Sequence, residues 1–109
     1  MTEADIHLPE QVGHSYGLDL DLLAAALGVR KNVLTDWPEK ADPPVRERFE
    51  KLRALLEGLA GVMRREFIAA WLRRPNEAAG GRFPLELLGA GEYAAVEEMV
   101  YRFEAGEPY

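Results

Sequence analysis

A long helical period runs through the middle of the sequence. Apolar residues recur there at steps of four and three: Val45, Phe49, Leu52, Leu56, Leu59 and Met63. This spacing places them on one face of an α-helix. A proline fits the first helical turn, so we expect the helix to begin near Pro44 and to break near residues 63–65. Gly58 and Gly61 weaken this helix but let another helix pack closely against it.

Shorter helices are expected on both sides of this run. Residues 19–27 predict a first helix, with the Asp19 carboxylate as its N-cap and Gly28 as its left-handed end. After a tight turn, residues 31–37 predict a second helix. Downstream helices are expected over three further segments: residues 67–72, 84–88 and 92–105. No stretch alternates as a strand does. The predicted fold class is therefore all-α, with an N-terminal helix-turn-helix, a long central helix and a small helical C-terminal domain.

The segment before the first predicted helix lacks a period. Residues 1–17 contain two glycines and a proline, and we expect a leader that is loosely ordered or held by Ile6 and Leu8. Residues 18–62 are then expected to form the helix-turn-helix region with the central helix, and residues 63–109 the C-terminal domain.

Side chains that carry chemistry are scarce. The chain has no cysteine, one serine and two histidines. Disulfides and cysteine nucleophiles are therefore excluded. We expect no catalytic serine–base–acid triad, because one serine and two histidines leave few side chains to build it. His7 and His14 have no metal-ligand spacing, so we expect no enzyme, no catalytic residue, no metal and no cofactor. The acidic N-terminus lacks the layout of a signal peptide, and no apolar run is long enough to cross a bilayer. These features indicate a cytoplasmic protein with no membrane partner.

The net charge of −6 is unevenly distributed along the chain. Residues 1–43 carry −5, residues 44–74 carry +4, and residues 75–109 carry −5. Nucleic-acid binders usually present a basic stripe, and the only basic stretch here is the central one. A solvated helix face that balances its acidic neighbours explains that stretch equally well, so both interpretations remain open.

The first two predicted helices have the size of a helix-turn-helix. In that motif the second helix presents its outer face to the major groove of DNA, and here that face carries Lys31, Asn32, Thr35 and Asp36. Asparagine pairs with adenine edges, and threonine contacts the methyl group of thymine. Any αα-hairpin in a bundle gives the same pattern, and the local acidity counts against DNA because contacts to phosphates supply most of the affinity.

A series of residues near the C-terminus follows the order of a known family. The series consists of Trp71-Leu72, Pro75-Asn76, the turn Gly80-Gly81-Arg82 before Pro84-Leu85, and a last helix that closes on Gly106. In this order and spacing, residues 63–106 resemble the toxin-binding C-terminal domain of the MbcA/ParS/Xre antitoxin family. Upstream, residues 22–29 with Leu34 and Trp37 are similar to the Xre-type helix-turn-helix of the same family.

The resemblance implies an antitoxin of a type II toxin–antitoxin module. Family members bind and occlude RES-domain toxins, which consume NAD; they commonly bind their own operator DNA, and they tend to be homodimers. On this chain we expect partner-binding residues in the C-terminal half: Arg82, Phe83, Arg102, Glu104, Glu107 and Tyr109. We expect DNA-binding residues at the second helix: Arg30, Lys31, Asn32 and Thr35. The alternatives are a stand-alone helix-turn-helix regulator and a helical scaffold that binds no DNA.

Three positions depart from the family pattern. Phe83 stands where the family usually has threonine or a similar small polar residue, and Ala79 replaces a usual leucine. Arg30 stands where a serine commonly caps the recognition helix, so this cap should be poor. The final residues 107–109 reach about 10 Å when extended. We expect this acidic tail to plug the electropositive mouth of an NAD-consuming toxin, with a frayed terminus as the alternative.

Overall fold

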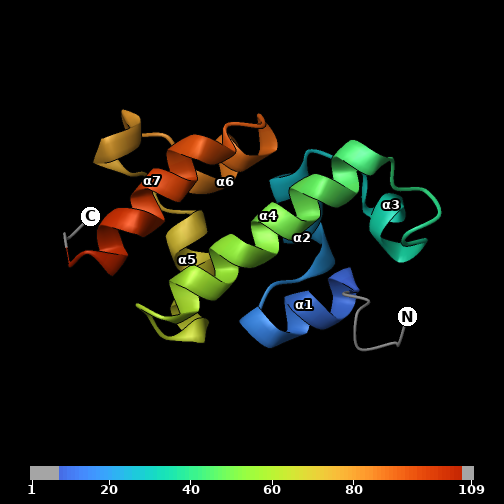
Figure 1. Cartoon of the computed structure of the whole chain (residues 1–109), viewed down its shortest axis with the longest axis horizontal. Helices are drawn as coiled ribbons and strands as arrows, with labels where there is room; N and C mark the ends of the chain where they lie inside the picture. Colours follow the sequence, from blue (N-terminus) through green and yellow to red (C-terminus); the bar gives the residue numbers. More distant parts are fainter. Residues whose placement is uncertain (1–7, 107–109) are drawn as a thin grey trace.

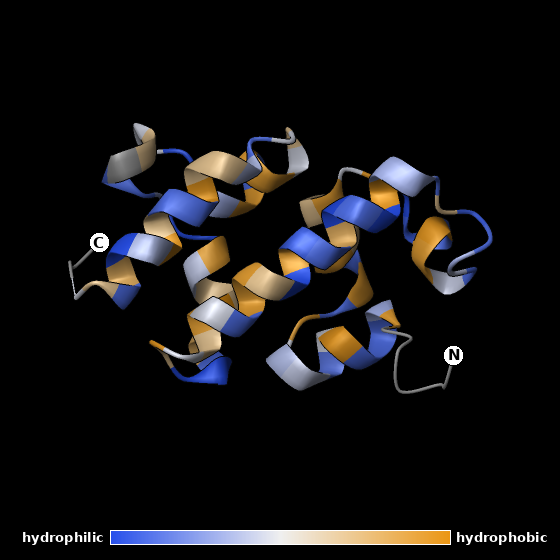
Figure 2. Cartoon of the chain, in the orientation of Figure 1, coloured by the Kyte–Doolittle hydropathy of each residue, from blue (hydrophilic) through white to orange (hydrophobic). Residues whose placement is uncertain are grey.

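Helix α4 (Pro43–Ala60) runs through the middle of the computed structural model, which describes residues 8–106 apart from the side chain of Ala78. Helix α4 packs against α1 (Pro9–Tyr16), α2 (Leu20–Leu27), α5 (Ile68–Leu72) and α7 (Tyr93–Glu104) (Figure 1). Hydrophobic and hydrophilic segments follow each other along its ribbon at every turn, as expected for an amphipathic helix with one apolar and one polar face (Figure 2). Its inward face buries most of the predicted apolar series and one further leucine: Val45, Phe49, Leu52, Leu55, Leu56 and Leu59. The predicted central helix is thus confirmed, and it begins one residue earlier than expected.

The N-terminal part consists of short helices: α1 (Pro9–Tyr16), α2 (Leu20–Leu27) and α3 (Lys31–Thr35). The Asp19 carboxylate accepts a hydrogen bond from the Leu22 N–H at 2.8 Å, which confirms the predicted N-cap of α2. Helix α3 ends at Thr35, two residues before the predicted end. The reason is that a residue directly before a proline disfavours helical backbone, and Trp37 precedes Pro38.

Helix α1 corrects the expectation of a leader without helical structure. Pro9 occupies the first helical position, and Gly17 ends the helix with φ at +70°. Val12 is buried and packs into the core. The helix is eight residues long, so its apolar stripe is too short to be recognised as a period. Leu8, which was expected to hold this segment, is exposed, and Ile6 lies outside the described residues.

The C-terminal part continues from α4 through short elements: η2 (Arg65–Phe67), α5 (Ile68–Leu72), η3 (Glu77–Ala79), α6 (Pro84–Gly89) and α7 (Tyr93–Glu104). The helix expected over residues 67–72 begins as the 3₁₀ turn η2, and Phe67 at its end is 54% exposed. In residues 8–106 the regular structure is helical except for one isolated bridge between Asn76 and Arg82. The all-α prediction is confirmed.

One hydrophobic core joins the N-terminal helices to the C-terminal part. Helices α2 and α6 approach so closely that a Cβ at Gly28 would lie 2.8 Å from the Gly89 carbonyl oxygen. A Cβ at Gly89 would lie 2.7 Å from the carbonyl oxygen of Ala25. Nearby, the buried Tyr93 hydroxyl at the start of α7 donates a hydrogen bond to the Ala26 carbonyl oxygen at 2.8 Å. The surface formed by α6 and α7 is therefore fixed to α2.

Candidate functional site

The turn over residues 76–82 closes on itself. The Asn76 N–H donates to the Arg82 carbonyl oxygen at 3.0 Å, and the Asn76 carbonyl oxygen accepts from the Gly81 N–H at 2.9 Å. Gly80 and Gly81 have φ at +67° and +86°, and a Cβ at either would meet nothing within 4 Å. Left-handed backbone, and not a lack of space, explains the two glycines. The turn places Arg82 directly before α6.

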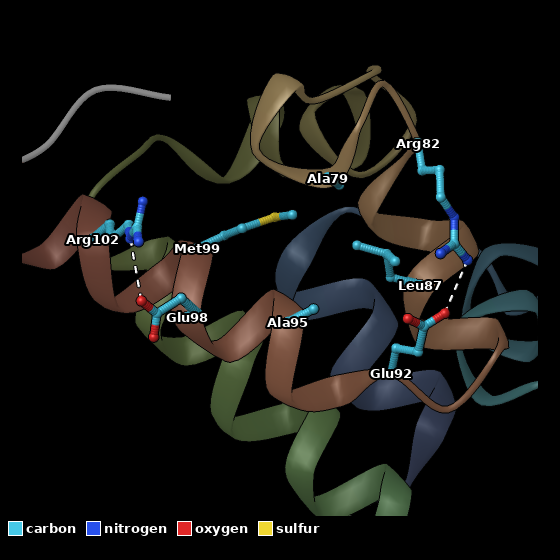
Figure 3. A pocket seen from close by; sticks show the side chains of 8 residues that line it. All are labelled: Ala79, Arg82, Leu87, Glu92, Ala95, Glu98, Met99 and Arg102. Atoms are coloured by element: carbon cyan, nitrogen blue, oxygen red, sulfur yellow. Dashed lines mark hydrogen bonds and ion pairs between the residues drawn. The ribbon is translucent and has the colours of Figure 1, made fainter.

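A groove of about 320 Å³ lies between this turn, α6 and α7 (Figure 3). Its lining comes from all three segments: Ala79, Arg82, Leu87, Glu92, Ala95, Glu98, Met99 and Arg102. Leu87 and Met99 are buried side chains that supply its apolar floor. The two arginines lie toward opposite ends of the view, each beside a glutamate (Figure 3). We call this surface the Arg82–Arg102 groove. An apolar centre with a charged rim is typical of protein–protein interfaces.

Each arginine of the groove is paired with a carboxylate of the α7 region. Arg82 Nη2 lies 3.0 Å from Glu92 Oε2, and Arg102 Nε lies 3.2 Å from Glu98 Oε1. Exposed pairs of this kind contribute roughly 0–1 kcal/mol to stability, so their main effect is to orient the guanidinium groups. A guanidinium has five N–H donors, and Arg82 keeps donors for a partner while it is bound to Glu92.

Phe83 lies beside Arg82 at the first turn of α6 and is 37% exposed. Its N–H donates to Glu86 Oε1 at 2.9 Å, which is one half of a capping box. The other half needs a side-chain acceptor at position 83, which phenylalanine lacks. Phenylalanine at this position therefore leaves the N-cap of α6 without a side-chain acceptor and presents a partly exposed ring. The two candidates of the tail, Glu107 and Tyr109, lie outside the described residues.

Glu104 lies on the other side of α7, away from the Arg82–Arg102 groove. A second groove of about 530 Å³ runs there between α4 and α7, and Glu104 lines it together with Glu57 and Glu97. We call it the α4–α7 groove. The structure thus brings Arg82 and Arg102 to one surface and places Glu104 on another.

The floor of the α4–α7 groove confirms one expectation about the central helix. A Cβ at Gly58 would lie 2.9 Å from Val100 Cγ1. The glycine of α4 therefore lets α7 pack closely against it, as the sequence pattern predicted.

The DNA-binding candidates are exposed on and beside α3: Arg30, Lys31, Asn32 and Thr35. Arg30 makes no side-chain cap to the helix, as expected. Lys31 Nζ lies 3.7 Å from Asp21 Oδ1, and the Thr35 hydroxyl donates to the Asn32 carbonyl oxygen at 3.1 Å. The helix has five residues, about 8 Å along its axis. Lys31 and Thr35 therefore make contacts within the chain, on an exposed helix face that is only five residues long.

Glu98 belongs to the acidic end of the last helix that the sequence indicated as partner-facing, but sequence reasoning missed Ala95 and Met99. Both recur with Glu98 and Arg102 at three- and four-residue steps, so the helical period was the available signal. Tyr101 was also missed, and at 67% it has the largest exposed fraction among the large hydrophobic residues of the described chain.

Residues 8–106 contain neither a candidate metal site nor a candidate membrane span. No group of three or more histidine, aspartate or glutamate side chains in this part of the chain is arranged to hold a metal ion. Among the same residues, no helix combines the length and the apolar character needed to cross a membrane.

The helical fold and the charged, apolar-floored groove define a protein-binding domain. The family model described as the antitoxin Xre/MbcA/ParS C-terminal toxin-binding domain matches residues 51–106. The chain belongs to this antitoxin family. This membership confirms the resemblance seen in the sequence and the expectation of a binding protein and not an enzyme. The match includes the second half of α4 and the whole Arg82–Arg102 groove.

The fold is also similar to that of a solved structure, the crystal structure of the M. tuberculosis MbcT–MbcA toxin–antitoxin complex. The similarity has a TM-score of 0.76 at 20% sequence identity, and it covers 92% of this chain and 93% of that chain. The likeness therefore extends beyond the matched domain to the N-terminal helices. No curated protein sequence matches this chain.

Proposed function

We propose that this antitoxin binds and occludes a RES-domain toxin that consumes NAD, and that it does so in the cytoplasm as a homodimer. Membership of the toxin-binding family supports the proposal, as does the fold likeness to a toxin–antitoxin complex. The observation that carries it is the Arg82–Arg102 groove, which brings two expected partner-binding residues to one surface of the matched domain.

The groove has the chemistry of a protein contact. Its apolar floor at Leu87 and Met99 gains free energy when a partner covers it, and Arg82 offers a planar fork to a carboxylate of the toxin. The tail candidates Glu107 and Tyr109 follow α7 in the sequence. We expect the Glu107 carboxylate to favour an electropositive toxin mouth, because such a mouth must hold the pyrophosphate of NAD.

The partner to test is the product of the neighbouring gene, which we expect to be a RES-domain toxin. Both proteins are purified, and NAD consumption is measured as the chain is titrated into the toxin. We expect complete inhibition at a fixed stoichiometry and a stable complex in size-exclusion chromatography. A toxin that keeps its activity in an excess of the folded chain would contradict the proposal.

Arg82→Ala is expected to weaken toxin binding by about tenfold, the effect of a moderate interface residue. The matched control is Glu92→Gln, which removes the ion pair but keeps the arginine; we expect its affinity to stay within about threefold. Titration calorimetry with the toxin measures both. An equal loss in the two variants would mean that Arg82 acts only through its ion pair with Glu92.

The same chain is proposed to bind its operator DNA through α3, because Arg30, Lys31, Asn32 and Thr35 are all exposed there. Lys31→Ala should then weaken binding by about tenfold and reduce the salt slope by about one. Fluorescence anisotropy with the DNA upstream of the gene, at several salt concentrations, measures both quantities. No binding at low salt would favour the scaffold alternative.

A further inference from the structure

Helix α7 carries a row of exposed residues between its two grooves. The Arg82–Arg102 groove runs along one side of the helix and the α4–α7 groove along the other. The exposed face between them is centred on Tyr101 and includes the glutamates at three- and four-residue steps from it: Glu98, which lines the first groove, and Glu97 and Glu104, which line the second. We call this face the α7 crest. All of its members are exposed.

Tyr101 stands in the middle of the crest. It is 67% exposed, and no hydrogen bond or ring contact of this side chain occurs within residues 8–106. The core does not depend on it, because α7 buries a different set: Tyr93, Val96, Met99 and Val100. Tyrosine is among the residues most enriched at the energetic centres of protein interfaces, since its ring buries a large rigid area.

Carboxylates surround this ring on the crest. Glu97 and Glu98 precede Tyr101 by four and three residues, and Glu104 follows it by three, so each Cβ lies about 5–6 Å away. Glu98 is paired with Arg102. Glu97 and Glu104 have no ion-pair partner in the described part of the chain. Lys51 lines the same groove as Glu97 and Glu104 but forms no ion pair with them in the described part of the chain. A partner that brings positive charge over the ring is therefore favoured by electrostatic complementarity.

We propose that Tyr101 is the aromatic anchor of the toxin interface, and that it enters a cationic cleft on the toxin. This inference rests on the proposed function. The two grooves beside α7 can accommodate the walls of such a cleft. In this arrangement the toxin contacts the helix on both sides of Tyr101. Lysine or arginine side chains at the rim of the cleft then pair with Glu97 and Glu104.

Tyr101→Ala is expected to weaken toxin affinity by about 30-fold, without changing the thermal unfolding of the free chain. Tyr101→Phe keeps the ring and should remain within about threefold. The matched control is Phe67→Ala, which removes another exposed ring from η2, outside the crest, and should also remain within about threefold. Glu97→Lys should weaken binding by about tenfold and flatten its salt dependence.

Titration calorimetry with the purified toxin measures these affinities, and sedimentation measures self-association. A wild-type chain that fails to bind the toxin overturns the proposed function as well. A wild-type chain that binds, together with a Tyr101→Ala variant of equal affinity, overturns the anchor alone. Loss of self-association at unchanged toxin affinity would assign the crest to a second copy of this chain and would also refute the anchor.

Discussion

Gly28→Ala is expected to lower the free energy of unfolding by about 3 kcal/mol. Gly28 has φ at +69°, a left-handed conformation that costs an L-residue roughly 1–2 kcal/mol. The added Cβ would also lie 2.8 Å from the Gly89 carbonyl oxygen. This clash forces α2 and α6 apart, and overpacking of that kind costs roughly 1–3 kcal/mol. Urea denaturation, with an unchanged m-value, measures the difference.

Substitutions at two other glycines distinguish the cost of left-handed backbone from the cost of the steric clash. Gly80→Ala meets the same backbone penalty, since φ is +67°, but its Cβ has nothing within 4 Å; we expect a loss of about 1 kcal/mol. Gly89→Ala has no left-handed φ and tests the close approach alone. If Gly28→Ala and Gly80→Ala lose equal stability, the packing of α2 on α6 contributes nothing to the effect.

A loss of stability is expected between pH 10 and pH 12. Burial disfavours the phenolate and raises the pKa of Tyr93 from 10.0 to about 12, although the Arg48 charge partly lowers it. Below pH 10 the folded and unfolded states both keep the proton. Between the two pKa values only the unfolded state releases it, so the free energy of unfolding falls as pH rises. The total loss is about 2–3 kcal/mol, since each unit of pKa difference corresponds to about 1.4 kcal/mol.

Tyr93→Phe is the control, because it has no proton to release. It loses the hydrogen bond to the Ala26 carbonyl oxygen, so we expect it to be about 1 kcal/mol less stable at pH 8. Its stability should then decline less steeply than that of the wild type from pH 10 to 12. Urea denaturation across this pH range compares the two proteins, and parallel curves would show that another group is responsible for the loss.

The sequence predicts the fold where local chemistry is decisive. The period of α4, the Asp19 cap and the left-handed Gly28 are local signals, and each is confirmed. Helix α1 was missed because its burial depends on contact with other helices, and its own stripe is too short. A helix was expected over residues 67–72, but the chain begins this segment as a 3₁₀ turn, and Phe67 at the end of that turn is exposed.

The candidate site was only partly predictable. Arg82 and Arg102 were expected from the family resemblance and the character of arginine, but their meeting in one groove depends on how α6 packs on α7. Their pairing with Glu92 and Glu98 requires the same packing. Tyr101 lies off the apolar stripe of α7, so the helical period indicates that it is exposed; the sequence pattern contained no signal that the exposed ring has a binding role.

Helix α4 belongs both to the toxin-binding domain and to the core beneath the N-terminal helices, and this limits how the chain can be engineered. The family match begins at residue 51, inside this helix, while α1 and α2 pack on the same helix. A shortened chain that starts there would keep Leu52 and Leu56 without the helices that cover them. Grafting the toxin-recognition surface onto another carrier therefore requires transplanting the N-terminal helices with it, even if they never touch the toxin.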